Sequence, residues 1–218
     1  MKPDMKLYIY DHCPFCVKAR MIFGLKNLPV TEVVLLNDDV QTPMRMIGQK
    51  MVPILEHDGH FMGESMDIIA HVDAMDGHPV LTGPTRPEIG QWMRDGQQAC
   101  IRLILPRFAA APLAEFATTG ARLYFIENKE AMIGPFGTCL AESDTLRAST
   151  NTALGQLADL IQSPDAVNGA LSTDDIHLFA HLRSLTLVAG LDWPAPVRTY
   201  CQHMSQATGI PLLDHMAG

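Results

Sequence analysis

A stretch rich in proline and glycine, residues 77–87, divides the chain into two parts whose patterns predict different folds. Residues 1–76 alternate short runs of β-forming residues with helical patterns, whereas residues 88–218 show only helical patterns. A chain of 218 residues is long enough for two modest domains. We therefore expect an α/β domain over 1–76, a linker over 77–87 and an all-helical domain over 88–218.

The first part is expected to hold strand, helix, strand, helix, two strands and a last helix. The first strand, helix and strand lie within 6–36, which is the minimal length for two parallel strands joined by a right-handed crossover. Asp58-Gly59 is a strong hairpin signal between the next two strands. The pattern predicts a four-stranded mixed sheet covered by helices, with strands over 6–10, 30–36, 52–56 and 60–62 and helices beginning at Pro14, Thr42 and Ser65.

The second part is expected to be a bundle of helices. Ser172 and Asp175 have the spacing of a capping box, with Asp in place of the usual Glu or Gln. The run that follows is apolar around much of its circumference, which predicts a central and largely buried helix. The expected helices cover 88–105, where Pro106 is expected to end the first, 113–129, 142–161, 176–188 and 194–207.

The charge of the chain argues against a nucleic-acid partner. The net charge is -8, and no two basic residues are adjacent, whereas a phosphate-binding surface needs clustered Lys and Arg. The first eleven positions carry Lys2 and Asp4 and have no apolar signal region. No apolar stretch approaches the roughly 18 residues of a membrane span. We expect a cytoplasmic protein without a membrane partner.

Five cysteines are few for this length and do not suggest a disulfide framework. The close pair is Cys13 and Cys16, in the motif Cys13-Pro14-Phe15-Cys16. In a reducing compartment such a pair is either metal-binding or redox-active. A structural zinc site would need a second pair of ligands, which the spacing of the other cysteines does not supply, so no metal is expected. We interpret the remaining three as structural or incidental: Cys100, Cys139 and Cys201.

Cys13 is the expected nucleophile because it directly precedes a helix that Pro14 helps to start. Free N–H groups and the positive end of the helix dipole stabilise a thiolate there, and lower a cysteine pKa to about 3.5–7.5. Cys16 lies one turn later on the same face, where it can resolve a mixed disulfide. Lys18 and Lys50 could add positive potential. The alternative, that both cysteines are buried apolar residues, is disfavoured by the strand–helix–strand context.

Two further motifs predict a binding site. Val52-Pro53 opens a strand opposite the cysteine pair, where a cis peptide can leave the preceding backbone free to pair with a substrate. Glu64 and Ser65 lie between a strand and a helix, where they can bind an amine and a carboxylate, Ser65 with help from the helix N-terminus. The alternative for Ser65 is that it is only an N-cap.

These motifs, at these separations, resemble the thioredoxin-fold domain shared by glutaredoxins and glutathione S-transferases. Stretches along nearly the whole chain, including its helical part, are similar to the bacterial glutaredoxin 2 family. They are Lys6 to Pro14, Ala19 to Asn27, Leu35 to Asp39, Gly48 to Lys50, Glu64 to Ile68, Ala166 to Gly169 and Leu185 to Gly190. The resemblance implies a thioredoxin-like domain followed by an all-helical domain like that of glutathione S-transferases.

The resemblance also implies the activity of a dithiol glutaredoxin that reduces protein and small-molecule disulfides with glutathione. It assigns the mixed disulfide with glutathione to Cys13 and the intramolecular disulfide to Cys16. It implies that glutathione is held by backbone groups of Val52 and by the pair Glu64 and Ser65. Phe15 departs from the family, which usually has Tyr there. The predicted glutathione-binding set is Phe15, Lys50, Val52, Pro53, Glu64 and Ser65. The resemblance favours a monomer.

Two other functions compete with this interpretation. A glutathione transferase stabilises the glutathione thiolate and conjugates it to an electrophile, often with Ser, Tyr or a lone Cys at the position of Cys13. The paired Cys16 favours the oxidoreductase, because resolution needs a second thiol. A scaffold or channel-like protein on the same fold has no need of two aligned sulfurs.

Overall fold

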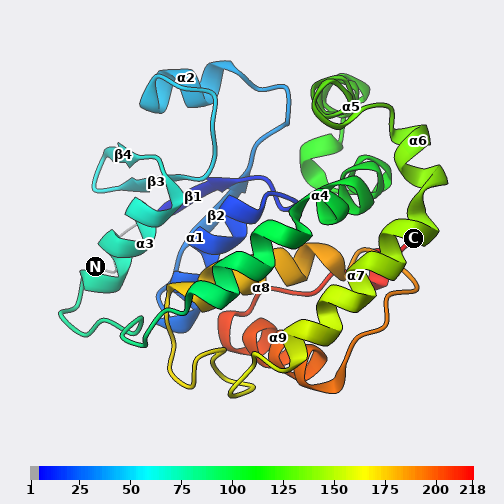
Figure 1. Ribbon diagram of the computed structural model, residues 1–218. Coiled ribbons are helices and arrows are strands. Elements are labelled where there is room, and N and C mark those ends of the chain that lie inside the picture. Colours follow the sequence, from blue (N-terminus) through cyan, green and yellow to red (C-terminus); the bar gives the residue numbers. More distant parts are fainter. Residues whose placement is uncertain (1–4) are drawn as a thin grey trace. The chain divides into compact units, whose positions relative to one another are not determined.

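The computed structural model describes residues 5–218, so Lys2 and Asp4 lie outside the described residues (Figure 1). Within that range the contacts divide the chain into two compact units. We call the first the sheet unit; it comprises residues 5–79 together with Pro112–Phe125. The helical unit comprises Val80–Ala111 and Ile126–Gly218. These units describe which residues pack together. The domain boundaries expected at residues 76 and 88 concern independently folding parts of the chain, and they remain a prediction.

The sheet unit is built on the predicted four-stranded mixed sheet, in the order β2-β1-β3-β4. β1 and β2 are parallel, with Leu7 opposite Glu32. β1 and β3 are antiparallel, with Leu7 opposite Leu55, and β3 and β4 form the predicted hairpin. The α/β fold class is thus confirmed. The strands are β1 (Lys6–Ile9), β2 (Thr31–Val34), β3 (Ile54–His57) and β4 (His60–Met62).

Three helices cover the sheet. α1 (Pro14–Leu25) and α3 (Ser65–Ala74) pack together on one face, and α2 (Gln41–Ile47) lies on the other (Figure 1). α1 has Pro14 in its first turn, a position where the missing N–H costs nothing. The core between α1, α3 and the sheet is apolar and fully buried; it includes Leu7, Ile9, Val17, Met21, Leu55, Ile68 and Val72.

The helical unit is organised around the long helix α4 (Pro87–Ala110), which packs against α6, α7 and α8. α9 packs against α7 and α8. α5 carries residues of both units. The other helices are η1 (Ala114–Phe116), α5 (Thr119–Ile133), α6 (Phe136–Ala141), α7 (Ser143–Ala158), α8 (Thr173–Leu185), α9 (Ala195–Thr208) and η2 (Asp214–Met216).

The predicted capping box is confirmed at the start of α8. Ser172 is the N-cap, and Asp175 accepts a hydrogen bond from its main-chain N–H at 2.9 Å. α8 is largely buried, as its apolar pattern predicted, with Ile176, Leu178 and Phe179 all inaccessible to solvent. The cap and the buried core therefore define α8 together.

Two expectations about the helical part were wrong, and one short helix was missed. α4 continues through Pro106 to Ala110, because burial of Leu103 and Phe108 on either side outweighs the lost main-chain hydrogen bond. The Arg107 guanidinium also donates to the Leu103 carbonyl at 2.8 Å. The single helix expected over 113–129 is instead η1 followed by α5, and the short α6 was not predicted.

Within residues 5–218, no helix is both long and apolar enough to cross a membrane.

Candidate active site

The cysteine motif lies between β1 and α1. Cys13 is the N-cap of α1, with an extended backbone (φ -75°, ψ 119°), and its carbonyl accepts the first helical hydrogen bond from Val17 at 3.0 Å. Cys13 is partly exposed, whereas Cys16 is fully buried. Both are free thiols. The accessible sulfur is therefore that of Cys13, as predicted.

The pKa of Cys13 is lowered to about 6. The largest cause is a hydrogen bond from the Cys16 thiol, which burial of Cys13 partly opposes. The charge of His12 and the main-chain N–H groups of Cys16 and Phe15 lower the pKa further. The helix N-terminus thus contributes as expected, but the second cysteine of the motif contributes more. A thiol with this pKa is largely a thiolate at neutral pH.

The pKa of Cys16 is shifted in the opposite direction. Burial raises its pKa well above the ordinary value, and the neighbouring Cys13 raises it further. The main-chain N–H of Tyr10 donates to Cys16 Sγ at 3.4 Å. At neutral pH the pair therefore consists of one accessible thiolate and one buried thiol. This division is the one that disulfide exchange requires of a nucleophile and a resolving group.

The other cysteines have a different environment. Burial raises the pKa of both Cys100 and Cys201 to about 12. Cys139 is also fully buried. Free thiols in such places behave as small apolar residues. The structure thus supports the structural interpretation of these three.

The topology brings the predicted binding motifs to the same edge of the sheet as Cys13. β1 and β3 are antiparallel, so the end of β1, which leads to Cys13, lies beside the start of β3, which Pro53 precedes. Leu55 pairs with Met62, so Glu64 and Ser65 follow β4 at that same edge. The Val52-Pro53 peptide bond is cis, as predicted.

Glu64 has a left-handed backbone (φ 61°, ψ 112°), which is rare for a residue with a side chain. It is the N-cap of α3, makes no side-chain capping hydrogen bond, and is exposed. Ser65 is the first residue of the helix and is 5% exposed. The alternative that Ser65 is the N-cap is therefore wrong. A strained backbone held beside a cysteine site is a reason to look for a bound ligand there.

Phe15 and Lys50 also lie in the sheet unit. Phe15 is 54% exposed, with the Lys18 ammonium 4.8 Å from the centre of its ring. Lys50 donates to the Asn37 carbonyl at 2.7 Å and lies 3.9 Å from the centre of the Tyr124 ring. Burial lowers the pKa of Lys18, and the negative charge that forms on Cys13 partly opposes this shift. Lys18 therefore interacts electrostatically with the Cys13 thiolate.

Sequence reasoning missed His12 and Glu115. The Glu115 carboxylate is fully buried and lies 2.8 Å from His12 Nδ1. Proximity of His12 to Cys13 in the sequence was a usable signal. Glu115 gave none, because it lies 103 positions away, in a stretch expected to be part of a helical domain.

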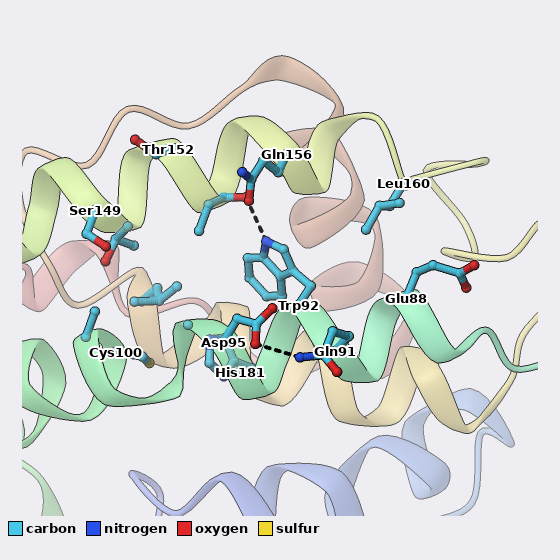
Figure 2. Close-up of a pocket in the computed structure, with 15 residues that line it drawn as sticks. Glu88, Gln91, Trp92, Asp95, Cys100, Ser149, Thr152, Gln156, Leu160 and His181 are labelled. Carbon is cyan, nitrogen blue, oxygen red and sulfur yellow. Dashed lines mark hydrogen bonds between the residues drawn. The ribbon is translucent and has the colours of Figure 1, made fainter.

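The helical unit holds a separate cavity of about 590 Å³ between α4, α7 and α8 (Figure 2). Trp92 donates from its ring N–H to the Ala153 carbonyl at 2.7 Å and forms one wall. The thiol that reaches this cavity is that of Cys100, whose pKa of about 12 keeps it protonated. The cavity is therefore not a second thiol–disulfide site.

No cluster of three or more His, Cys, Asp or Glu side chains within residues 5–218 is arranged to hold a metal ion.

Comparison with known proteins assigns both parts of the chain. Residues 88–217 match the family described as "Glutaredoxin 2, C terminal domain", and residues 7–80 match "Glutathione S-transferase, N-terminal domain". Glutaredoxin 2 of Escherichia coli (strain K12) is 55% identical over 98% of this chain and 100% of its own length.

Solved structures agree. Glutaredoxin 2 from Salmonella typhimurium in complex with glutathione is 56% identical, covers 98% of this chain and 99% of its own, and superposes with a TM-score of 0.97. A glutathione S-transferase from Rhodospirillum rubrum, 17% identical over 97% of this chain and 91% of its own, shares the fold with a TM-score of 0.62. Together with the cysteine site, these similarities place the chain in the glutaredoxin 2 family.

Proposed function

We propose that Cys13 and Cys16 are the nucleophile and the resolving thiol of this glutathione-dependent oxidoreductase. Membership of the glutaredoxin 2 family makes the chain a glutaredoxin. These roles are supported by the opposite pKa shifts of the two thiols. The pKa of Cys13 is lowered to about 6, and the pKa of Cys16 is raised well above its ordinary value. Only the first is a thiolate at neutral pH, and the thiolate is the attacking form.

The reaction then proceeds in two halves. The Cys13 thiolate attacks one sulfur of a substrate disulfide, forms a mixed disulfide and releases the other sulfur, which takes a proton as a thiol. Cys16 loses its proton and attacks Cys13 Sγ, which closes the Cys13–Cys16 disulfide and releases the second substrate thiol. One glutathione thiolate attacks Cys13 Sγ and frees Cys16, and a second attacks the glutathione sulfur and frees Cys13. Two electrons pass from two glutathione molecules, which leave as one disulfide, to the substrate.

Glutathione is proposed to bind at the sheet edge beside Cys13. The Salmonella relative was solved with glutathione, and its 56% identity supports a similar site here. Ser65, in the first turn of α3, and the strained Glu64 before it suit the carboxylate and the amine of the same γ-glutamyl group. Main-chain groups of Val52 would form hydrogen bonds with the main chain of glutathione. Phe15, Lys50 and Pro53 complete the proposed set.

Glu64→Gln tests this glutathione site. The substitution removes the charge that pairs with the amine but keeps the size of the side chain. We expect KM for glutathione to rise about fivefold with kcat nearly unchanged, since a partly solvated ion pair contributes about 1 kcal/mol to binding. Asp67→Gln, which changes an exposed carboxylate in the same helix turn, is the control. An unchanged KM in Glu64→Gln would remove this residue from the site.

Reduction of hydroxyethyl disulfide by glutathione tests the roles of the cysteines. Cys13→Ser is expected to abolish activity and Cys16→Ser to retain part of it, because glutathione can resolve the mixed disulfide directly. Cys139→Ser, a buried cysteine outside the motif, is the matched control. Unchanged activity in Cys13→Ser would contradict the proposal. Conjugation of a model electrophile at a rate above that of disulfide reduction would favour a transferase.

Other features remain proposals. The two family matches, to residues 7–80 and 88–217, support folding domains over 1–76 and 88–218 with a linker between them. Glutathionylated and disulfide-bonded proteins are proposed substrates. A monomer in the cytoplasm is proposed, where a glutathione pool keeps thiols reduced.

A further inference from the structure

One oxygen of Glu115 holds both the main chain and the side chain of His12. Glu115 Oε1 accepts a hydrogen bond from the His12 main-chain N–H at 2.9 Å and lies 2.8 Å from His12 Nδ1. A carboxylate acceptor places a proton on Nδ1 and so fixes the tautomer and the orientation of the ring. His12 directly precedes Cys13. The carboxylate thereby fixes the backbone and the ring next to the nucleophile.

This pair is enclosed by aromatic side chains. Glu115 is inaccessible to solvent and His12 is 8% exposed. The His12 ring stacks on Tyr10 and Phe116, with ring centres 5.7 and 5.1 Å apart, and meets the edge of Phe125 at 5.0 Å. In such surroundings the carboxylate and the imidazole interact more strongly than they would in water.

The Glu115 carboxylate is not needed merely to attach the 112–125 segment to the rest of the sheet unit. The main-chain carbonyl of Glu115 already accepts a hydrogen bond from the Asn37 N–H at 2.9 Å. Glu115 Oε2 is buried without a hydrogen-bond partner among the described residues, which is an unfavourable arrangement for a carboxylate that only fills space. A buried polar atom without a partner is rare in a folded protein and calls for an explanation beyond packing.

We infer that Glu115 is a positioning residue for thiol–disulfide exchange: through His12 it stabilises the Cys13 thiolate. This inference rests on the proposed role of Cys13 and goes beyond it, because it assigns a function to a residue outside the cysteine motif. The positive charge of His12 is one of the causes of the lowered pKa of Cys13. Removal of the Glu115 charge weakens the stabilisation of that positive charge and frees the ring to turn.

The other polar and charged groups near Cys13 must be kept constant in a test. On α1 they are the Cys16 thiol, the main-chain N–H groups of Phe15 and Cys16, and the Lys18 ammonium. On the β1 side there is the Tyr10 phenol, whose pKa is raised mainly by burial and also by both cysteines. None of these is altered by a substitution at Glu115.

The experiment measures alkylation of Cys13 by iodoacetamide from pH 4.5 to pH 9, with the modified residue identified by mass spectrometry. Glu115→Gln keeps the size of the side chain and removes its charge. Glu127→Gln, the same change at an exposed position in α5, is the control. We expect the rate for Glu115→Gln at pH 6 to fall about fivefold, as for a pKa raised by about one from about 6, with the rate at pH 9 retained. Glu127→Gln should superpose on the wild type.

A pH profile of Glu115→Gln that superposes on the wild type would overturn the inference. So would an equal loss of rate at pH 6 and pH 9, since that pattern indicates general damage. His12→Gln, with Glu115 intact, provides a second route should Glu115→Gln not fold: the same rise in the midpoint is expected, and a wild-type midpoint would contradict the inference. Because alkylation needs no substrate disulfide, its outcome is separate from the fate of Cys13→Ser in the reductase assay.

Discussion

The main-chain N–H of Tyr10, at the end of β1, donates a hydrogen bond to Cys16 Sγ across 3.4 Å. This contact joins Cys16, the proposed resolving cysteine, to an inner strand of the sheet, one residue beyond the pairing of Ile9 with Val34. The position of the buried sulfur is thus set by the sheet as well as by α1. The two thiols can then differ in protonation although they lie in one helical turn.

The Cys16 thiol should control the acidity of Cys13, because its hydrogen bond is the largest cause of the lowered pKa. In Cys16→Ala we expect the pKa of Cys13 to rise above about 6. Alkylation at pH 6 should then slow about tenfold, with little change at pH 9. If the midpoint of the pH dependence of alkylation is unchanged in Cys16→Ala, the Cys16 thiol does not lower the pKa of Cys13, which would contradict this prediction.

The lowered pKa of Cys13 also predicts how stability depends on pH. A group with a folded pKa of about 6 and an unfolded pKa near 9.0 stabilises the fold fully above pH 9 and loses that contribution as the pH falls through 6. Between these values the reduced wild type should gain stability relative to Cys13→Ser as the pH rises. The gain should not exceed about 1.4 kcal/mol for each unit of pH, and screening at this partly exposed site should reduce it.

Urea unfolding under reducing conditions at pH 6, 7 and 8 would measure this gain. Cys16 contributes little to the difference in that range, because its raised pKa keeps it protonated in the folded state and its ordinary pKa, near 9.0, keeps it mostly protonated in the unfolded state. A difference between the two proteins that stays constant from pH 6 to pH 8 would be inconsistent with a thiolate in the folded state.

Asp175 should be the most sensitive polar residue of the helical unit. Its Oδ1 accepts from the Val167 N–H and the Tyr200 hydroxyl, and its Oδ2 accepts from the N–H and the hydroxyl of Ser172. Asp175→Asn turns an amide group toward two donors, so the free energy of unfolding should fall by about 2–4 kcal/mol. Ser172→Ala removes one hydroxyl and should cost about 1 kcal/mol. Thermal unfolding would compare them, and equal losses would contradict the argument.

Gly83 and Gly96 should respond oppositely to alanine. A Cβ on Gly83 would lie 2.2 Å from the Ala170 carbonyl oxygen, and the Gly83 N–H already donates to the Leu171 carbonyl at 2.7 Å. Gly83→Ala must therefore displace backbone and destabilise the helical unit. A Cβ on Gly96, inside α4, meets nothing within 4 Å, so Gly96→Ala should stabilise by about 0.5–1 kcal/mol. A stable Gly83→Ala protein would show that the 170–171 backbone moves freely.

The sequence predicted what depends on local chemistry. Pro14 after Cys13, the Asp58-Gly59 hairpin and the Ser172–Asp175 cap each act within a few residues, and each is present in the structure. The expected end of a helix at Pro106 was wrong, because the packing of α4 outweighs the local tendency of proline to end a helix. The spacing of apolar residues in the sequence does not report that packing. Glu115 could not be found from its neighbours, since its role depends on His12, which lies 103 positions earlier.

The return of Pro112–Phe125 to the sheet unit has a consequence for how this chain can be divided or recombined. The unit that surrounds Cys13 is not a contiguous piece of sequence: the carboxylate of Glu115 and the rings of Phe116 and Phe125 come after the whole of α4. A chimera joined at residue 80 would carry the cysteine motif and His12 into a new protein, but it would lack the Glu115, Phe116 and Phe125 side chains that contact the His12 ring. The cysteine motif and its surroundings are therefore inherited together only when both parts of the chain are inherited together.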